Sequence, residues 1–171
     1  MNALTGRAFT RELKLGPSLT GIGIIFTATA LVAALGGAVT APNIGEWYHH
    51  LPKPAWTPPD WVFGPVWAAL YASMAVAASI VWVQRACDDV CCPLSAYGAQ
   101  LFLNLAWSVC FFGFQSPLLG FLDVCFLWVM VGVTAAEFTL VSRTAGLLML
   151  PYWLWVTFAG VLNAAIVLHG G

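Results

Sequence analysis

The sequence LTGIGIIFTATALVAALGGAV occupies residues 19–39 and contains no charged side chain. A helix that crosses a lipid bilayer needs about 20 consecutive, mostly apolar residues, and this stretch meets that requirement. Four later stretches are similarly apolar, at about residues 61–83, 94–113, 118–140 and 146–168. They are too long and too uniformly apolar for barrel strands, so only helices satisfy their backbone in lipid. The sequence predicts an all-α membrane protein, built as a bundle of five transmembrane helices.

The composition agrees with a chain whose surface faces lipid. Of its 171 residues, 61% are hydrophobic and only 8% are charged, whereas soluble domains have about 25% charged residues. The net charge of −1 provides no basic surface for nucleic acid. We therefore expect membrane lipid as a partner and no nucleic-acid partner.

The chain divides into a short basic arm at residues 1–16 and a single transmembrane domain at residues 17–171. The arm contains Arg7, Arg11 and Lys14 and resembles the first part of a signal peptide. No small-residue cleavage site follows it. We therefore expect the arm to be retained in front of the first helix.

The first connection between the predicted helices is long and contains Pro42, Pro52, Pro54, Pro58 and Pro59. Because proline cannot donate a backbone hydrogen bond, we expect this connection to be non-helical. The other connections are short, so sequential helices should pack as neighbours.

Basic residues are distributed unevenly between the two ends of the predicted bundle. Lys53 alone would lie on one side of the membrane, and the other side would hold Arg7, Arg11, Lys14, Arg85 and Arg143. Basic residues favour the cytoplasmic side. The N-terminus is therefore predicted to lie inside if the host is a bacterial inner membrane. The sequence is compatible with a bacterial cell membrane and with the mitochondrial outer membrane.

The cysteines do not form a recognisable metal or disulfide pattern. Cys87, Cys91 and Cys92 cluster in the second connection, whereas Cys110 and Cys125 lie in apolar stretches. No histidine lies near the cluster, and an odd number of cysteines argues against a closed disulfide framework. We therefore predict no metal site, and the sequence leaves the role of the cluster open.

The segment WYHHLPKPAWTPPDWVFGPVWAALY, residues 47–71, is the most informative in the chain. Tryptophan favours the headgroup region of a membrane, and such an aromatic belt explains Trp47, Trp56 and Trp61. It does not explain Trp67, which lies well inside the second predicted span on the same helical face as Tyr71.

Three ordered motifs resemble those of the translocator protein (TspO) family, also called tryptophan-rich sensory proteins or peripheral benzodiazepine receptors. The first motif is matched by Trp47, Tyr48, Leu51, Lys53, Pro54, Trp56, Pro58, Pro59, Pro65, Trp67, Leu70 and Tyr71. The second is matched by Gln100, Leu101, Asn104, Trp107, Phe111, Phe112 and Gly113. The third is matched by Pro151, Tyr152, Trp155, Leu162 and Asn163, and an intramembrane acid of the family by Asp123. The resemblance covers about residues 17–165.

This resemblance implies a five-helix bundle around a hydrophobic pocket that the long first connection closes. It implies that the ligand is a porphyrin, such as haem or protoporphyrin IX, with sterols and benzodiazepine-type compounds as further ligands. It also implies a homodimer and no required cofactor. The ligand-binding residues expected from it are Tyr48, Trp67, Asn104, Trp107, Trp155 and Ala159. The residues expected in the lid are Trp47, Lys53, Trp56, Pro58 and Pro59.

Helical spacing favours the same region on physical grounds. Asn104 and Trp107 share one face of the third predicted span, and an asparagine in hydrocarbon should face the bundle interior. If Trp67, Trp107 and Trp155 all face inward, they line an aromatic cavity that suits a planar macrocycle. The alternative is that these tryptophans only pack the bundle and that Asn104 and Asn163 only join its helices.

Few charged or titratable side chains accompany this region. We expect Asp123 to make a structural hydrogen bond to a neighbouring helix and Glu137 to lie at the membrane interface. For Lys53 the sequence leaves three roles open: it holds the lid in place, it pairs with a propionate of a bound porphyrin, or it is a solvated cation. His49 and His50 lie in the first connection, where ligation of haem iron is an open alternative.

The sequence leaves three functions to compare. A tetrapyrrole-binding receptor or sensor, with ligand transport as a further role, is favoured by the motifs. A light-dependent porphyrin-degrading enzyme would need the same tryptophans, but the spans contain no catalytic constellation. A secondary transporter would be expected to show buried midplane charges or internal repeats. The C-terminal AAIVLHGG also lacks the tyrosine and basic residue of the sterol-binding pattern.

Overall fold

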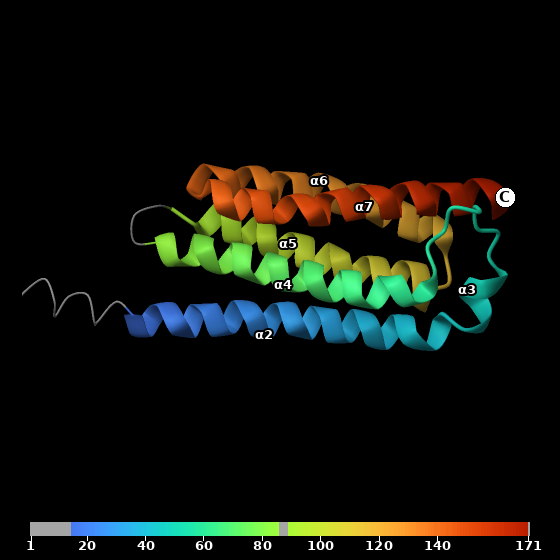
Figure 1. Ribbon diagram of the computed structural model, residues 1–171, viewed down its shortest axis with the longest axis horizontal. Helices are drawn as coiled ribbons and strands as arrows, with labels where there is room; N and C mark the ends of the chain where they lie inside the picture. Colours follow the sequence, from blue (N-terminus) through green and yellow to red (C-terminus); the bar gives the residue numbers. More distant parts are fainter. Residues whose placement is uncertain (1–14, 86–88, 171) are drawn as a thin grey trace, which may run out of the picture.

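The structure, a computed structural model, describes residues 15–85 and 89–170. Five long helices lie side by side in one bundle (Figure 1). They are α2 (Leu15–Thr40), α4 (Asp60–Gln84), α5 (Cys91–Ser108), α6 (Pro117–Val141) and α7 (Arg143–Gly170). All five belong to segments long enough and apolar enough to cross a membrane. The prediction of an all-α, five-helix membrane protein is confirmed.

The helices begin and end within about one turn of the predicted spans. Local capping explains one of these boundaries, because the Ser116 side chain accepts a hydrogen bond from the backbone N–H of Leu119 at 3.3 Å. Pro117 then occupies the first position of α6, where no backbone N–H is required. Ser142 alone separates α6 from α7, so the predicted break at residues 142–144 is shorter than expected. Residues 1–14 of the predicted basic arm and Cys87 lie outside the described residues.

The helices form a closed ring in which each one packs mainly on two neighbours, and α4 also contacts α5 and α6 across the ring. α6 packs against α5 and α7, α4 packs against α7 and α2, and α2 closes the ring by packing against α5. Small residues allow the closest approaches, as where Gly146 of α7 lies against Thr139 of α6. Large apolar side chains such as Leu140 and Leu168 project outward from the ring. Lipid solvates such side chains without penalty, so this surface is suited to a membrane.

The half of the bundle remote from the first connection has a solid core. Met74, Val81, Val131 and Phe138 are fully buried there. Tyr152 is also fully buried, at the edge of this core that faces the α3 end of the bundle. Protein cores of this kind pack at close to crystal density and resist deformation. This part of the molecule therefore acts as a rigid base for the other half.

The first connection contains two short helical segments, so the prediction that it is non-helical is wrong. η1 (Ala41–Asn43) is a 3₁₀ turn and α3 (Glu46–His50) is an α-helix. Pro42 lies in the first turn of η1, where a missing N–H costs nothing, and residues 46–50 contain no proline. The prolines that follow keep residues 51–59 free of helix, and this segment contains one turn in which the Thr57 backbone N–H donates to the backbone oxygen of Pro54 at 3.0 Å.

The C-terminus lies at the same end of the bundle as α3, and the connections α4–α5 and α6–α7 lie at the opposite end (Figure 1). Arg85 and Arg143 belong to those opposite connections, whereas Lys53 belongs to the α3 end. This separation of basic residues is the arrangement on which the predicted orientation depends.

Candidate ligand-binding site

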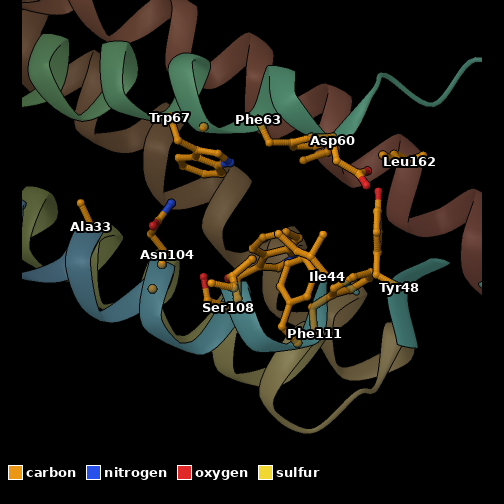
Figure 2. Close-up of a pocket in the computed structure, with 18 of the residues that line it drawn as sticks. Ala33, Ile44, Tyr48, Asp60, Phe63, Trp67, Asn104, Ser108, Phe111 and Leu162 are labelled. Atoms are coloured by element: carbon orange, nitrogen blue, oxygen red, sulfur yellow. The ribbon is translucent and has the colours of Figure 1, made fainter. Parts of the chain in front are cut away.

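A cavity of about 550 Å³ lies between α2, α4, α5 and α7, at the end of the bundle that α3 covers (Figure 2). Its volume is within the range of about 300–1,000 Å³ that small-molecule sites occupy. Aromatic rings dominate its wall: Tyr48, Trp61, Phe63, Trp67, Tyr71, Trp107, Phe111 and Phe112. The site is therefore suited to a large, flat and mostly apolar ligand.

Small residues leave room for the cavity between α2 and α4. Gly36 and Gly37 line it from α2, and Gly64 and Ala68 line it from α4. A side chain at residue 36 would meet the hydroxyl group of Ser108, because a β-carbon there would lie 3.3 Å from that oxygen. Glycine at this position keeps the Ser108 hydroxyl at the cavity wall.

Asn104 forms the inner end of the cavity and joins three helices. Its carbonyl oxygen Oδ1 accepts a short hydrogen bond from the Tyr71 hydroxyl of α4. Its amide nitrogen Nδ2 donates to the Tyr152 hydroxyl of α7 at 2.9 Å. Asn104 is only 2% exposed. The two alternative roles of Asn104, cavity residue and interhelical link, are thus both present in its geometry.

Trp107 is held against the wall by a second polar contact between helices. Its indole nitrogen donates to Oδ1 of Asn163 at 3.4 Å, and Nδ2 of Asn163 donates to the backbone oxygen of Pro117 at 2.7 Å. The Trp107 ring stacks on Phe111, with centroids 5.4 Å apart and planes 16° apart. Trp107 and Phe111 therefore present a stable aromatic surface to the cavity.

Trp67 reaches the cavity from α4. Its ring contacts Tyr71 and Tyr152, with centroids 5.6 and 6.2 Å away. Figure 2 shows its indole nitrogen directed into the open space, on a different side of the cavity from Phe111. Among the described residues this nitrogen has no hydrogen-bond partner. It is a donor available to a ligand.

Trp155 does not line the cavity with the other two tryptophans. Its ring instead packs between Phe63 and Phe158, with centroids 5.8 and 5.4 Å away. Phe63 lines the cavity, as does Ala159, one turn beyond Trp155 on α7. Of the three indoles expected to face one hollow, Trp67 and Trp107 line the cavity and Trp155 does not, because α4 places Phe63 against its ring. Trp61, which was assigned to the aromatic belt, lines the cavity as well.

Tyr48 and Lys53 contact each other in the first connection, which was predicted to form the lid of the cavity. Tyr48 is buried and lines the cavity. The Lys53 ammonium donates to the backbone oxygen of Tyr48 at 2.7 Å and lies 3.8 Å above the Tyr48 ring. Burial, with a further contribution from the negative charge of Asp60, raises the pKa of Tyr48 to about 12. The phenol therefore stays neutral at the mouth of the cavity.

The remaining lid residues support the connection from outside the cavity. Trp47 packs edge-on against Phe111 at 5.4 Å between centroids. Trp56 contacts Phe158 of α7 at 5.8 Å. Pro58 is half-buried, and Pro59 directly precedes the first residue of α4. None of these four predicted lid residues lines the cavity.

The π-helical turn η2 (Val109–Gly113) is a feature that sequence reasoning did not predict. It follows α5 and brings Phe111 and Phe112 under α3, where both are buried. Such turns often occur at functional sites because they redirect side chains that a regular helix would place elsewhere. Sequence reasoning also did not select four residues that line the cavity: Phe63, Tyr71, Ser108 and Phe111. Tyr71 and Phe111 could have been found, because they belong to the motifs described above.

Two polar predictions outside the cavity have different outcomes. Asn163 joins α5, α6 and α7 through the two hydrogen bonds given above, and it also lines the cavity. The buried Oδ2 of Asp123 has no hydrogen-bond partner among the described residues. The predicted helix-to-helix link through this oxygen is therefore not present in the described residues.

Comparisons with known proteins agree with this architecture. The profile of the TspO/MBR family matches residues 24–168. The chain is 40% identical over 139 residues to the tryptophan-rich protein TspO of Chlorobaculum tepidum, covering 80% of this chain and 88% of that protein. It is 34% identical over 142 residues to the translocator protein of Sus scrofa, covering 80% and 84%. It is 36% identical over 140 residues to the tryptophan-rich sensory protein of Cereibacter sphaeroides, covering 82% and 85%.

The family profile extends from within α2 to near the end of α7 and so includes residues of every helix that lines the cavity. With its five apolar helices, the chain is a multi-pass integral membrane protein. It belongs to the TspO/MBR family.

Proposed function

We propose that this protein is a membrane receptor or sensor that binds a tetrapyrrole, such as protoporphyrin IX or haem, in the cavity below α3. The observation that carries the proposal is the placement of Trp67 and Trp107 on one apolar cavity of about 550 Å³. Extended aromatic rings stack on indole and phenyl groups, and each good contact contributes about 0.5–1.5 kcal/mol beyond its buried area. A planar macrocycle can use several such contacts at once.

The polar groups of the cavity support a ligand with a few hydrogen-bonding positions. The indole nitrogen of Trp67 is an available donor, and the Ser108 hydroxyl lies at the wall. Small-molecule sites commonly combine an apolar lining with a few such groups that orient the ligand. The names of the relatives, tryptophan-rich sensory protein and translocator protein, support a sensing or carrier role for this site.

Fluorescence quenching tests the proposal directly. Titration of the purified protein with protoporphyrin IX in detergent should quench tryptophan emission in a saturable way. Trp67→Phe and Trp107→Phe should each weaken binding by about 2- to 10-fold, because the smaller phenyl ring gives up part of the stacking surface and the indole N–H donor. Trp128→Phe is the matched control, since Trp128 lies on α6 outside the cavity and donates to Thr157 of α7.

Two results would contradict this function. One is the absence of saturable quenching at micromolar porphyrin. The other is an equal loss of affinity in the Trp128→Phe control, because that would trace the quenching to porphyrin adsorbed on the outer surface. Sterol-like and benzodiazepine-type compounds, which we propose as further ligands of the same cavity, should displace the porphyrin competitively.

We also propose that the end of the bundle holding α3 faces away from the cytoplasm in a bacterial inner membrane. The supporting observation is that Arg85 and Arg143 lie at the opposite end from Lys53. A reporter enzyme that is active only outside the cytoplasm should be active when fused to the C-terminus. The expected homodimer is a further proposal, and the mass of the protein–detergent complex tests it.

A further inference from the structure

Asp60 contributes the only charged side chain among the described residues that line the cavity. The rest of the wall is aromatic, aliphatic, glycine or neutral polar. Figure 2 shows the Asp60 carboxylate at the end of the cavity below α3, pointing toward the Tyr48 hydroxyl. A carboxylate at the end of an otherwise uncharged, apolar site influences which ligand atoms can lie there, because the described residues of the cavity wall hold no opposite charge.

The fold keeps this carboxylate at the mouth. Asp60 is the first residue of α4, and the first turn of a helix attracts negative charge. Its Oδ2 lies 3.3 Å from Nε2 of His49 on α3. The Asp60 side chain is 36% exposed, so water reaches it while its position remains defined from two elements.

The nearest lysine does not turn toward the cavity. The Lys53 ammonium is engaged by the backbone oxygen and the ring of Tyr48, and Lys53 is not among the residues that line the cavity. The negative charge of Asp60 acts on Tyr48, since it contributes to the raised pKa of that phenol. The mouth therefore offers a ligand an anionic acceptor, and the cation that could receive a carboxylate is directed elsewhere.

We propose that Asp60 is a specificity residue that selects ligands by charge: the mouth of the cavity accepts a cationic or hydrogen-bond-donating group and excludes a carboxylate. This inference rests on the proposed function. For a tetrapyrrole, it means that a neutral ester is preferred over the free diacid at the Asp60 end. A bound diacid must direct its propionates away from that end.

The experiment compares protoporphyrin IX with its dimethyl ester, which has the same ring and no carboxylates. Dissociation constants are measured by tryptophan quenching at about pH 8, where most histidine side chains are neutral. The natural protein should prefer the ester, and Asp60→Asn should reduce the preference ratio about fivefold or more, mainly by tightening diacid binding. The ratio between variants removes differences in how the two porphyrins partition into detergent.

Two further variants make the comparison specific. Asp60→Glu keeps the charge and should keep the preference for the ester. Asp89→Asn removes a carboxylate from the second connection, where Asp89 accepts a hydrogen bond from the backbone N–H of Cys91, and should leave the ratio unchanged. An Asp60→Asn protein that fails to fold would be recognised by its thermal unfolding curve, and the Asp60→Glu and Asp60→Ser ratios would then decide the question.

The outcomes separate this inference from the function on which it rests. If both porphyrins bind but Asp60→Asn leaves the ratio at its natural value, charge selection by Asp60 is wrong and tetrapyrrole binding stands. If neither porphyrin binds the natural protein saturably, the proposed function fails and this inference fails with it. A ratio that changes equally in Asp89→Asn would also overturn it, since that would indicate an effect of net charge.

Discussion

The indole ring of Trp82 on α4 lies against the backbone of Gly21 on α2, in the space that a β-carbon at residue 21 would need. The two residues meet near the end of the bundle opposite α3. At the α3 end, the same two helices enclose the cavity. α2 and α4 are therefore in close contact at the end where Gly21 meets Trp82, and they enclose the cavity at the α3 end.

The Gly21→Ala substitution should destabilise the protein even though alanine favours helix formation. The added methyl group overlaps the Trp82 ring, and overpacking of this kind costs about 1–3 kcal/mol. Thermal unfolding in detergent measures the loss. Gly23→Ala is the matched control, since no atom lies within 4 Å of a β-carbon there. Equal unfolding temperatures for both variants would show that the Trp82 contact has no energetic weight.

Trp155→Phe should affect ligand binding less than Trp67→Phe. Trp67 lines the cavity, whereas Trp155 does not line it and packs against the cavity residue Phe63. Porphyrin affinity, measured by ligand absorbance so that the removed fluorophore does not matter, should fall clearly for Trp67→Phe and little for Trp155→Phe. A greater loss for Trp155→Phe would mean that the ligand moves Phe63 aside on binding.

Filling the cavity from α7 should block binding without unfolding the bundle. Ala159 lines the cavity, and a phenylalanine at this position would extend into a space of about 550 Å³. We expect Ala159→Phe to weaken porphyrin binding about tenfold or more, while unfolding temperature stays close to that of the natural protein. Ala136→Phe on the exposed face of α6 serves as the control. Unimpaired binding by Ala159→Phe would place the ligand elsewhere.

The lid should be sensitive to strongly alkaline pH. Tyrosine ionises near pH 10 in an unfolded chain, whereas burial and Asp60 raise the pKa of Tyr48 to about 12. Between these values the native state retains a proton that the unfolded state has lost, so stability is full below pH 10 and falls as pH rises toward 12. The tyrosinate absorbance of the natural protein minus that of Tyr48→Phe should remain absent at pH 10 and develop toward pH 12. A difference titration centred near pH 10 would show that the phenol is freely solvated.

The number and extent of the helices were predictable because the thickness of the membrane sets the length of each apolar stretch. Breakers such as Pro117 and caps such as Ser116 then mark where a helix begins. Local signals failed at α3, where neighbouring prolines obscured a proline-free helical turn at residues 46–50.

Which face of a helix turns inward was predictable only where a polar residue reveals it. Asn104 and Asn163 are buried as hydrocarbon requires of amides, and they make hydrogen bonds between helices. A tryptophan does not indicate which face of its helix turns inward, because an indole is equally stable on a lipid-facing surface, in a core or on a cavity wall. Trp67 and Trp155 could therefore not be distinguished until the helices were packed.

The amino-acid order alone was sufficient for the helices, their approximate ends and the motifs of the family, since these depend on local composition and on the width of the bilayer. The rotation of each helix, the π-helical turn that carries Phe111 and the placement of Asp60 at the cavity mouth arose only on packing. The physical reason is that spans apolar on all sides have no preferred inward face of their own, so contacts such as that of Trp82 with Gly21 decide it.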